Sequence, residues 1–147
     1  MTALTDYSEA FILDWWLRGQ TRTPPTTVYV GLLTTNPTAD AGTGAVEVTG
    51  GGYARQAVPC TATGWRSTQG DTAATSTGTG GTTANNALIS FPAPTAQWGV
   101  VTGVAVYDAL TAGNMLWWAA QTPNKTVNNG DPGPTIAAGA LTLQLDN

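Results

Sequence analysis

Histidine is absent from this sequence, and lysine occurs once, as Lys125. Without histidine, Ser-His-Asp and Cys-His catalysis, histidine-based metal sites and the usual general base near neutral pH are all excluded. Ser-Lys chemistry would depend on Lys125 alone. The nine acidic residues are dispersed, and the close pair Asp6 and Glu9 is explained better by the start of a helix. We therefore expect a protein that is not an enzyme and that holds no cofactor.

Cysteine also occurs only once, as Cys60, which excludes an internal disulfide and a multi-cysteine metal site. We expect Cys60 to be a small buried hydrophobe. No apolar run approaches the roughly 18–20 residues that span a bilayer. The N-terminus carries Asp6 and Glu9 rather than a basic region followed by an apolar run, so no secretory signal is predicted. These features predict synthesis in a cytoplasm, with no membrane partner.

Charge is scarce throughout, because only 10% of the residues are charged and the net charge is −4, whereas soluble domains carry about 25% charged residues. Cations are too scattered to form a basic patch, so nucleic-acid binding is not expected. The glycine-rich segment 78–83 lacks the lysine of a phosphate-binding loop. Asn128, Asn129 and Asp131 indicate a tight turn rather than a calcium site. A surface with so few charges is typical of a protein that works inside an assembly.

Hydrophobic periodicity predicts one helix followed by many short strands. Residues 5–19 form the helix, with Thr5 or Asp6 as its cap and Gly19 at its end. A side-chain period of two, with turn residues between the segments, predicts strands at 27–33, 45–49, 53–58, 60–65, 87–91, 100–108, 114–121, 125–127 and 140–146. The chain, of 147 residues, is thus expected to be a single domain, 1–147, in the mainly β class. The prediction is an antiparallel β-sandwich of jelly-roll type over 27–147 with the N-terminal helix packed on it.

A low-complexity segment interrupts the strands at about 67–86, where Gly, Ser, Thr and Ala dominate. Such a composition buries too little apolar surface to form a core face. Nearly twenty residues without structure are unusual inside one domain. The segment is predicted to be either a loop or an arm that orders against a partner.

Six tryptophans are many for one small core. In segment 114–121, strict strand alternation places Met115 and Trp117 on one face and Leu116 and Trp118 on the other, so both faces need cover. Either the helix covers the second tryptophan with Phe11 and Trp15, or at least one tryptophan lies in a subunit interface. The candidate interface residues are Trp15, Trp16, Trp98, Trp117 and Trp118.

Several segments together resemble a family of small tailed-bacteriophage virion proteins. They are VYVGLLTTNPT, GGYARQAV, ISFPAPTAQWGVVTGVAVYDA, GNMLWWAAQTPNKTVNNGD and IAAGALTLQLD, preceded by the helix with DWWLRG. Members of this family are often labelled tail-fibre proteins, and β-sandwich proteins of similar size serve as cement on phage heads. The resemblance implies a virion location and a structural role, and it supplies no catalytic residues.

Two functions follow from this resemblance. The first is a capsid decoration, or cement, protein that binds major capsid protein subunits and copies of itself, as a trimer, and stabilises the head shell through repeated weak contacts. The alternative is a tail-tip or tail-fibre module that recognises the host surface, with Trp98 beside Gln97 as a platform for glycans. A third, weaker hypothesis is a non-viral sugar-binding domain. A tryptophan in a loop is also commonly a packing plug, and that reading of Trp98 stays open here.

Overall fold

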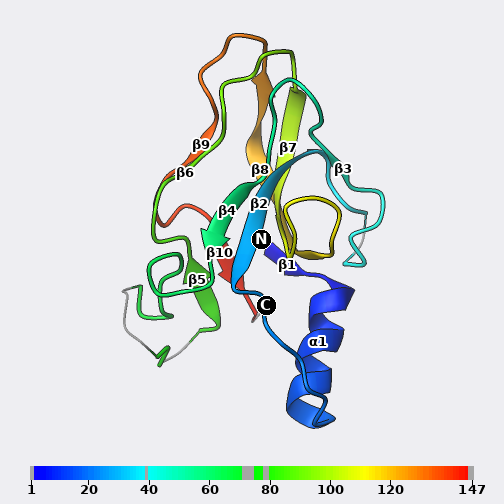
Figure 1. The fold of residues 1–147 in the computed structure, drawn as a ribbon, viewed down its shortest axis with the longest axis vertical. Helices are drawn as coiled ribbons and strands as arrows, with labels where there is room; N and C mark the ends of the chain where they lie inside the picture. Colours follow the sequence, from blue (N-terminus) through cyan, green and yellow to red (C-terminus); the bar gives the residue numbers. More distant parts are fainter. Residues whose placement is uncertain (1, 39, 71–74, 78–79, 146–147) are drawn as a thin grey trace.

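The computed structural model describes residues 2–38, 40–70, 75–77 and 80–145 (Figure 1). The chain begins with a short strand, β1 (Thr2–Leu4), and continues into the helix α1 (Asp6–Leu17). The next strands are β2 (Thr27–Thr35), β3 (Val46–Glu47), β4 (Gln56–Pro59) and β5 (Thr82–Ala84). The last five are β6 (Ile89–Ser90), β7 (Gly99–Tyr107), β8 (Met115–Val127), β9 (Thr135–Ile136) and β10 (Thr142–Gln144).

The largest sheet has the order β1-β8-β7-β2-β3, and β4 also pairs with β2. Every pairing in it is antiparallel. Two short antiparallel ribbons, β10-β5 and β6-β9, complete the described strands. The prediction of a mainly β, antiparallel fold with one N-terminal helix is confirmed. The jelly-roll topology is consistent with this arrangement and stays a prediction.

The main core lies between the large sheet and the two ribbons. Val28, Val30 and Leu32 of β2 face it, as the alternation in segment 27–33 predicts. Ile89 in β6 and Leu143 in β10, one from each ribbon, close it from the opposite side. A second, smaller cluster lies on the other face of the large sheet, around Leu33, Ala105 and Tyr107. Both faces of the central strands are therefore buried, which explains the nearly continuous apolar sequence of β2.

Several sequence predictions differ from the structure where regular alternation is broken. Val100 is 46% exposed while Val101 is in the core, because the pairing of β7 with β8 shifts between Val101 and Gly103. Leu145, which regular alternation with Leu141 and Leu143 would place inward, is 55% exposed just beyond the end of β10. The predicted strand 60–65 is a turn, and it contributes only an isolated bridge from Trp65 to Asn85.

The low-complexity segment is more ordered at its ends than its composition suggests. Thr82–Ala84 form β5, and Asn85, in the same segment, is 0% exposed. The Asn85 amide nitrogen Nδ2 donates to the carbonyl oxygens of Ala87 and Ala137, at 2.7 and 2.9 Å, and its Oδ1 accepts from the Leu141 N–H at 2.9 Å. Residues 71–74 and 78–79 of the predicted arm lie outside the described residues. Composition does not predict the burial of Asn85, because a polar side chain that forms hydrogen bonds with the backbone of three residues can be buried at little cost.

Candidate interaction surface

A β-bulge in β8 decides where the adjacent tryptophans point. Val106 pairs with Trp117 and Tyr107 pairs with Met115, so Leu116 is the extra residue between these two pairs. Leu116 and Trp117 consequently pack with the main core, whereas Met115 and Trp118 pack with the smaller cluster. The strict alternation predicted from the sequence is wrong at this point. Neither indole Nε1 has a hydrogen-bond partner in the structure.

The bulge also anchors the N-terminal helix. The Leu116 carbonyl oxygen accepts from the Thr5 backbone N–H at 3.1 Å and from the Ser8 hydroxyl at 2.9 Å. The Thr5 hydroxyl donates to the Met115 carbonyl oxygen, at 2.5 Å, instead of capping the helix. Thr5 is 2% and Ser8 6% exposed, and Ser8 is the one buried residue of α1. The helix is thus held by its first turn.

Beyond the first turn, α1 projects from the sandwich instead of lying flat on a sheet (Figure 1). Leu13 is 53% exposed, Trp15 56%, Trp16 66% and Leu17 77%. These apolar side chains point in several directions around the helix, so packing one face of the helix against the sheet could not bury all of them. We call these four residues the helix patch. The rings of Trp15 and Trp16 lie beside each other, with centroids 6.2 Å apart, and exposed apolar surface of this kind commonly marks an interaction site.

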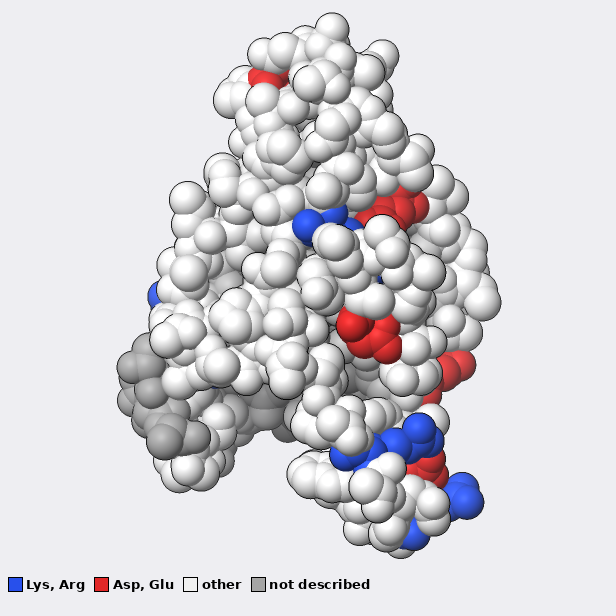
Figure 2. Space-filling view, in the orientation of Figure 1, with Lys and Arg blue, Asp and Glu red and all other residues white. Residues whose placement is uncertain are grey.

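The C-terminal part of α1 carries the local charge. Asp14 pairs with Arg18 at 3.5 Å and with Arg22, which follows the helix. The hydrogen bond from Arg22 holds the pKa of Asp14 below its usual value. In the space-filling view these charges gather around the helix, while most of the remaining face is uncharged (Figure 2).

An apolar groove of about 710 Å³ separates α1 from the body of the protein. Phe11 and Trp15 line its helix side, and Trp65, Leu116 and Trp117 line its sheet side. The same view shows this face hollowed between the helix and the sandwich (Figure 2). The helix therefore shares a groove with Trp117 without closing over it, and Trp118 lies on the other side of the sheet.

The structure selects one of the two interpretations of Trp98 and corrects the prediction for Cys60. Trp98 is 5% exposed, its Nε1 donates to the Gly51 carbonyl oxygen at 2.9 Å, and its ring meets Tyr53 edge-on at 5.3 Å between centroids. It is a packing plug, and it offers no platform to a glycan. Cys60, expected to be buried, is exposed and lines the groove because it follows β4 at the sheet edge.

A buried ionic cluster was not predicted from the sequence. Arg55, 9% exposed, donates from Nε and Nη2 to both carboxylate oxygens of Glu47, at 2.9 and 2.7 Å. Its Nη1 donates to the carbonyl oxygens of Ala109 and Ala112 at 2.7 and 2.8 Å. The guanidinium also lies 3.4 Å from the Tyr107 ring centroid. The sequence signal for this cluster was Arg55 itself, a single arginine in a charge-poor stretch eight residues after Glu47. The carbonyl groups that complete the cluster are more than fifty residues away and could not be predicted from the sequence.

Gly31 leaves room for this cluster, since a Cβ there would lie 2.8 Å from a Glu47 oxygen and 2.9 Å from the Tyr53 hydroxyl. That hydroxyl donates to Glu47 at 2.7 Å and accepts from the Leu32 N–H at 2.9 Å. Burial and the Glu47 carboxylate raise the pKa of Tyr107 to about 12, and burial is the larger cause. Burial also raises the pKa of Tyr53. The cluster connects β2, β3 and the 108–114 loop, and it therefore stabilises the fold.

Among the described residues, no group of three or more His, Cys, Asp or Glu side chains is placed to hold a metal ion. Within that same part of the chain, no helix has the length and apolar character needed to cross a membrane.

These features define an antiparallel β protein with a projecting apolar helix, which is suited to contacts with other proteins. A protein-family model described as podophage GP4 fiber I protein gp80 matches residues 3–144, nearly the whole chain. The chain belongs to this family, and it is a structural protein of a bacteriophage. No curated protein matches it. The family description names a fibre, which agrees better with the tail-fibre alternative than with capsid decoration.

Proposed function

We propose that the chain is a tail-fibre subunit that joins copies of itself through the helix patch and presents the opposite end of the sandwich to the host surface. The observation that carries this proposal is the helix patch, in which Trp15 and Trp16 are more than half exposed. Exposed aromatic residues supply much of the binding energy at protein interfaces. A fibre built of repeated subunits requires such contacts, and the family description supports a fibre.

The end of the sandwich away from α1 has features that suit outward presentation (Figure 1). Three turns meet there and are tied by backbone hydrogen bonds: Gly130 N–H to the Pro94 carbonyl at 3.0 Å, and Thr95 N–H to the Gly51 carbonyl at 2.9 Å. The Trp98 indole adds its bond to Gly51. Loops held on a rigid scaffold are common sites of recognition. Host recognition in this proposal therefore rests on these turns and not on an exposed Trp98.

Immunogold labelling of intact phage particles with an antibody against this protein tests the location. Label confined to the tail is expected. Label spread evenly over the head would contradict the proposal and support capsid decoration, and label in neither place would contradict a virion role.

A pair of variants tests the helix patch in the particle. Trp16→Ser should lower the amount of this protein in purified virions, because its indole would no longer be buried in the subunit contact. Leu88→Ser is the matched control: Leu88 is 61% exposed, close to the 66% of Trp16, but it adjoins β6. Equal incorporation of both variants, with both folded, would contradict attachment through the helix patch.

Binding to cells tests the outward end. Purified protein is expected to adsorb to cells of the phage's host and to compete with the phage for them. If the protein neither binds the cells nor delays phage adsorption, the recognition half of the proposal is wrong while the attachment half stands.

A further inference from the structure

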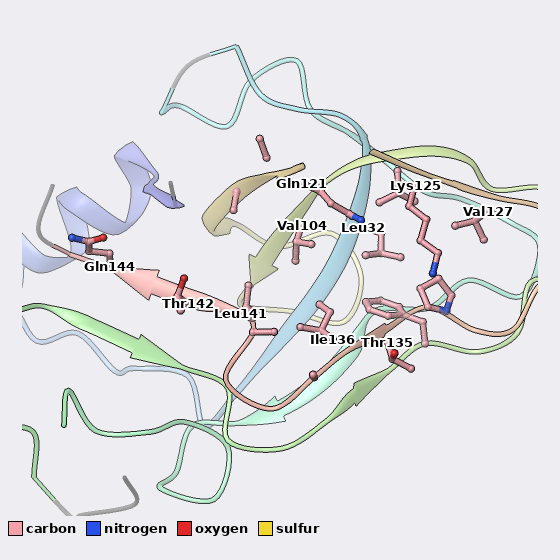
Figure 3. Close-up of a pocket in the computed structure, with 17 residues that line it drawn as sticks. Leu32, Val104, Gln121, Lys125, Val127, Thr135, Ile136, Leu141, Thr142 and Gln144 are labelled. Atoms are coloured by element: carbon pink, nitrogen blue, oxygen red, sulfur yellow. The ribbon is translucent and has the colours of Figure 1, made fainter. Parts of the chain in front are cut away.

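A second cavity, of about 410 Å³, lies between the large sheet and the segment 134–144 (Figure 3). This volume is within the range of roughly 300–1,000 Å³ that is typical of small-molecule sites. Its inner walls are apolar: Leu32 of β2, Val104 of β7, Phe91, and Ile136 and Leu141 from the facing segment. It is separate from the groove beside α1, since the two share no lining residue.

The opening of the cavity is set by an irregularity in β8. Val101 pairs with Lys125 and Gly103 pairs with Ala120, so residues 121–124 of β8 are inserted opposite Thr102 alone. Gln121 is the first residue of this insertion and Lys125 directly follows it, and both line the cavity. In Figure 3 the Lys125 side chain extends from β8 toward the segment that carries Thr135, and the Gln121 amide points toward Leu32. The insertion thereby brings one cation and one amide to a cavity whose inner walls are apolar.

Lys125 is available to a ligand. Arg18 and Arg22 pair with Asp14, and Arg55 pairs with Glu47, whereas no ion pair of Lys125 exists within the described residues. A lysine ammonium binds a carboxylate through charge-assisted hydrogen bonds. The hydroxyls of Thr135 and Thr142, on the facing segment, also line the cavity.

The apolar walls favour an aliphatic carboxylate over a sugar acid. A sugar acid has hydroxyl groups on every side, and burying them against Leu32, Val104 and Leu141 would leave them without hydrogen bonds. An aliphatic chain needs no such partners and gains from leaving water. We propose that this cavity binds a medium-chain aliphatic carboxylate, with its chain between the layers and its carboxylate on Lys125. This activity is additional to the fibre role and independent of it.

Calorimetric titration of the purified full-length protein tests the chain. Octanoate is expected to bind saturably and roughly tenfold more tightly than hexanoate, because two more methylene groups are buried. Glucuronate is expected to show no binding. Equal affinities for hexanoate and octanoate, tighter binding of glucuronate, or no binding of octanoate would each overturn the proposal.

A charge-removing variant tests the head group. Lys125→Met keeps the aliphatic stem, so octanoate should then bind no better than octanol, whereas the native protein should prefer octanoate. Arg18→Met, the same loss of charge on α1, should leave octanoate binding unchanged. Retention of the preference by Lys125→Met would overturn the assignment of Lys125.

Phosphatidylglycerol vesicles test whether the ligand is instead a phospholipid. Phosphatidylglycerol carries a phosphodiester and ester-bound acyl chains but no free carboxylate, so the native protein is expected to stay in the supernatant of a co-sedimentation assay while it still binds octanoate. Retention of the native protein but not of Lys125→Met on the vesicles would overturn the assignment of the ligand to a free carboxylate.

Discussion

At the residue scale, Arg55 combines an ion pair with Glu47, hydrogen bonds to two backbone carbonyls and a contact with the Tyr107 ring. Arg55→Met would leave the Glu47 carboxylate without its cation and remove the donors to the Ala109 and Ala112 carbonyls. Breaking a buried ion pair by deleting one partner costs about 3–5 kcal/mol. We expect a loss of that size in the free energy of unfolding, measured with denaturant. The exposed Arg18→Met should lose less than about 1 kcal/mol, and a similar loss for both variants would show that the Arg55 contacts add little.

The raised pKa values of the tyrosines around Arg55 predict that the free energy of unfolding decreases at alkaline pH. The pKa of Tyr107 is about 12 in the folded protein, against about 10 in an unfolded chain. Between these values the unfolded chain has lost the proton that the folded protein keeps. The contribution of Tyr107 to stability is therefore complete below pH 10 and falls by about 1.4 kcal/mol per pH unit as pH rises toward 12.

Denaturant titrations at a series of pH values measure this slope. Tyr107→Phe keeps the ring against Arg55 and should make the decline shallower. A remaining slope is expected from Tyr53, whose pKa burial also raises. An unchanged slope in Tyr107→Phe would assign the alkaline effect elsewhere.

At the scale of elements, periodicity predicts the positions of strands well and their irregularities poorly. The faces of β2 follow from Val28, Val30 and Leu32, and the helix begins and ends close to its predicted bounds. Leu116 shows the limit, because a bulge depends on the pairing of β8 with β7 and not on the residues of β8 alone. The projection of α1 likewise could not be predicted from the sequence, because the hydroxyls of Thr5 and Ser8 donate to carbonyl groups more than a hundred residues away. Of the candidate site residues, Trp15 and Trp16 are exposed, whereas Trp98 fills a core position.

The attachment of α1 predicts a local effect of a nearly isosteric change. Thr5→Val removes the hydroxyl that donates to the Met115 carbonyl, with a cost of about 1–3 kcal/mol for a buried unpaired group. Because α1 has one buried residue, this cost should fall on the helix alone. Amide hydrogen exchange should become roughly five- to a hundredfold faster in α1, with β2 and β7 unchanged. Thr49→Val, at an exposed threonine, is the control, and an equal change in all elements would show that the helix is not an independent unit.

At the scale of the whole molecule, the scarcity of charge and the exposed apolar helix both favour self-association. With 10% charged residues, the surface opposes association only weakly. The contacts available to the helix patch are mainly hydrophobic, and sulfate strengthens such contacts while salt weakens ionic ones. If copies of the chain join through this patch, self-association should therefore increase with sulfate concentration.

Sedimentation equilibrium over a wide range of protein concentrations measures this association. Trp16→Glu places a charge at a side chain that is 66% exposed, so its folding should be unaffected and its self-association weakened at least roughly tenfold, as for a central aromatic residue of an interface. Leu88→Glu makes the same change at a site that is 61% exposed but adjoins β6, and it should associate like the native protein. A native protein that stays monomeric at every concentration and sulfate level would contradict self-assembly through α1. Equal weakening by both variants would instead assign the association to the general scarcity of surface charge.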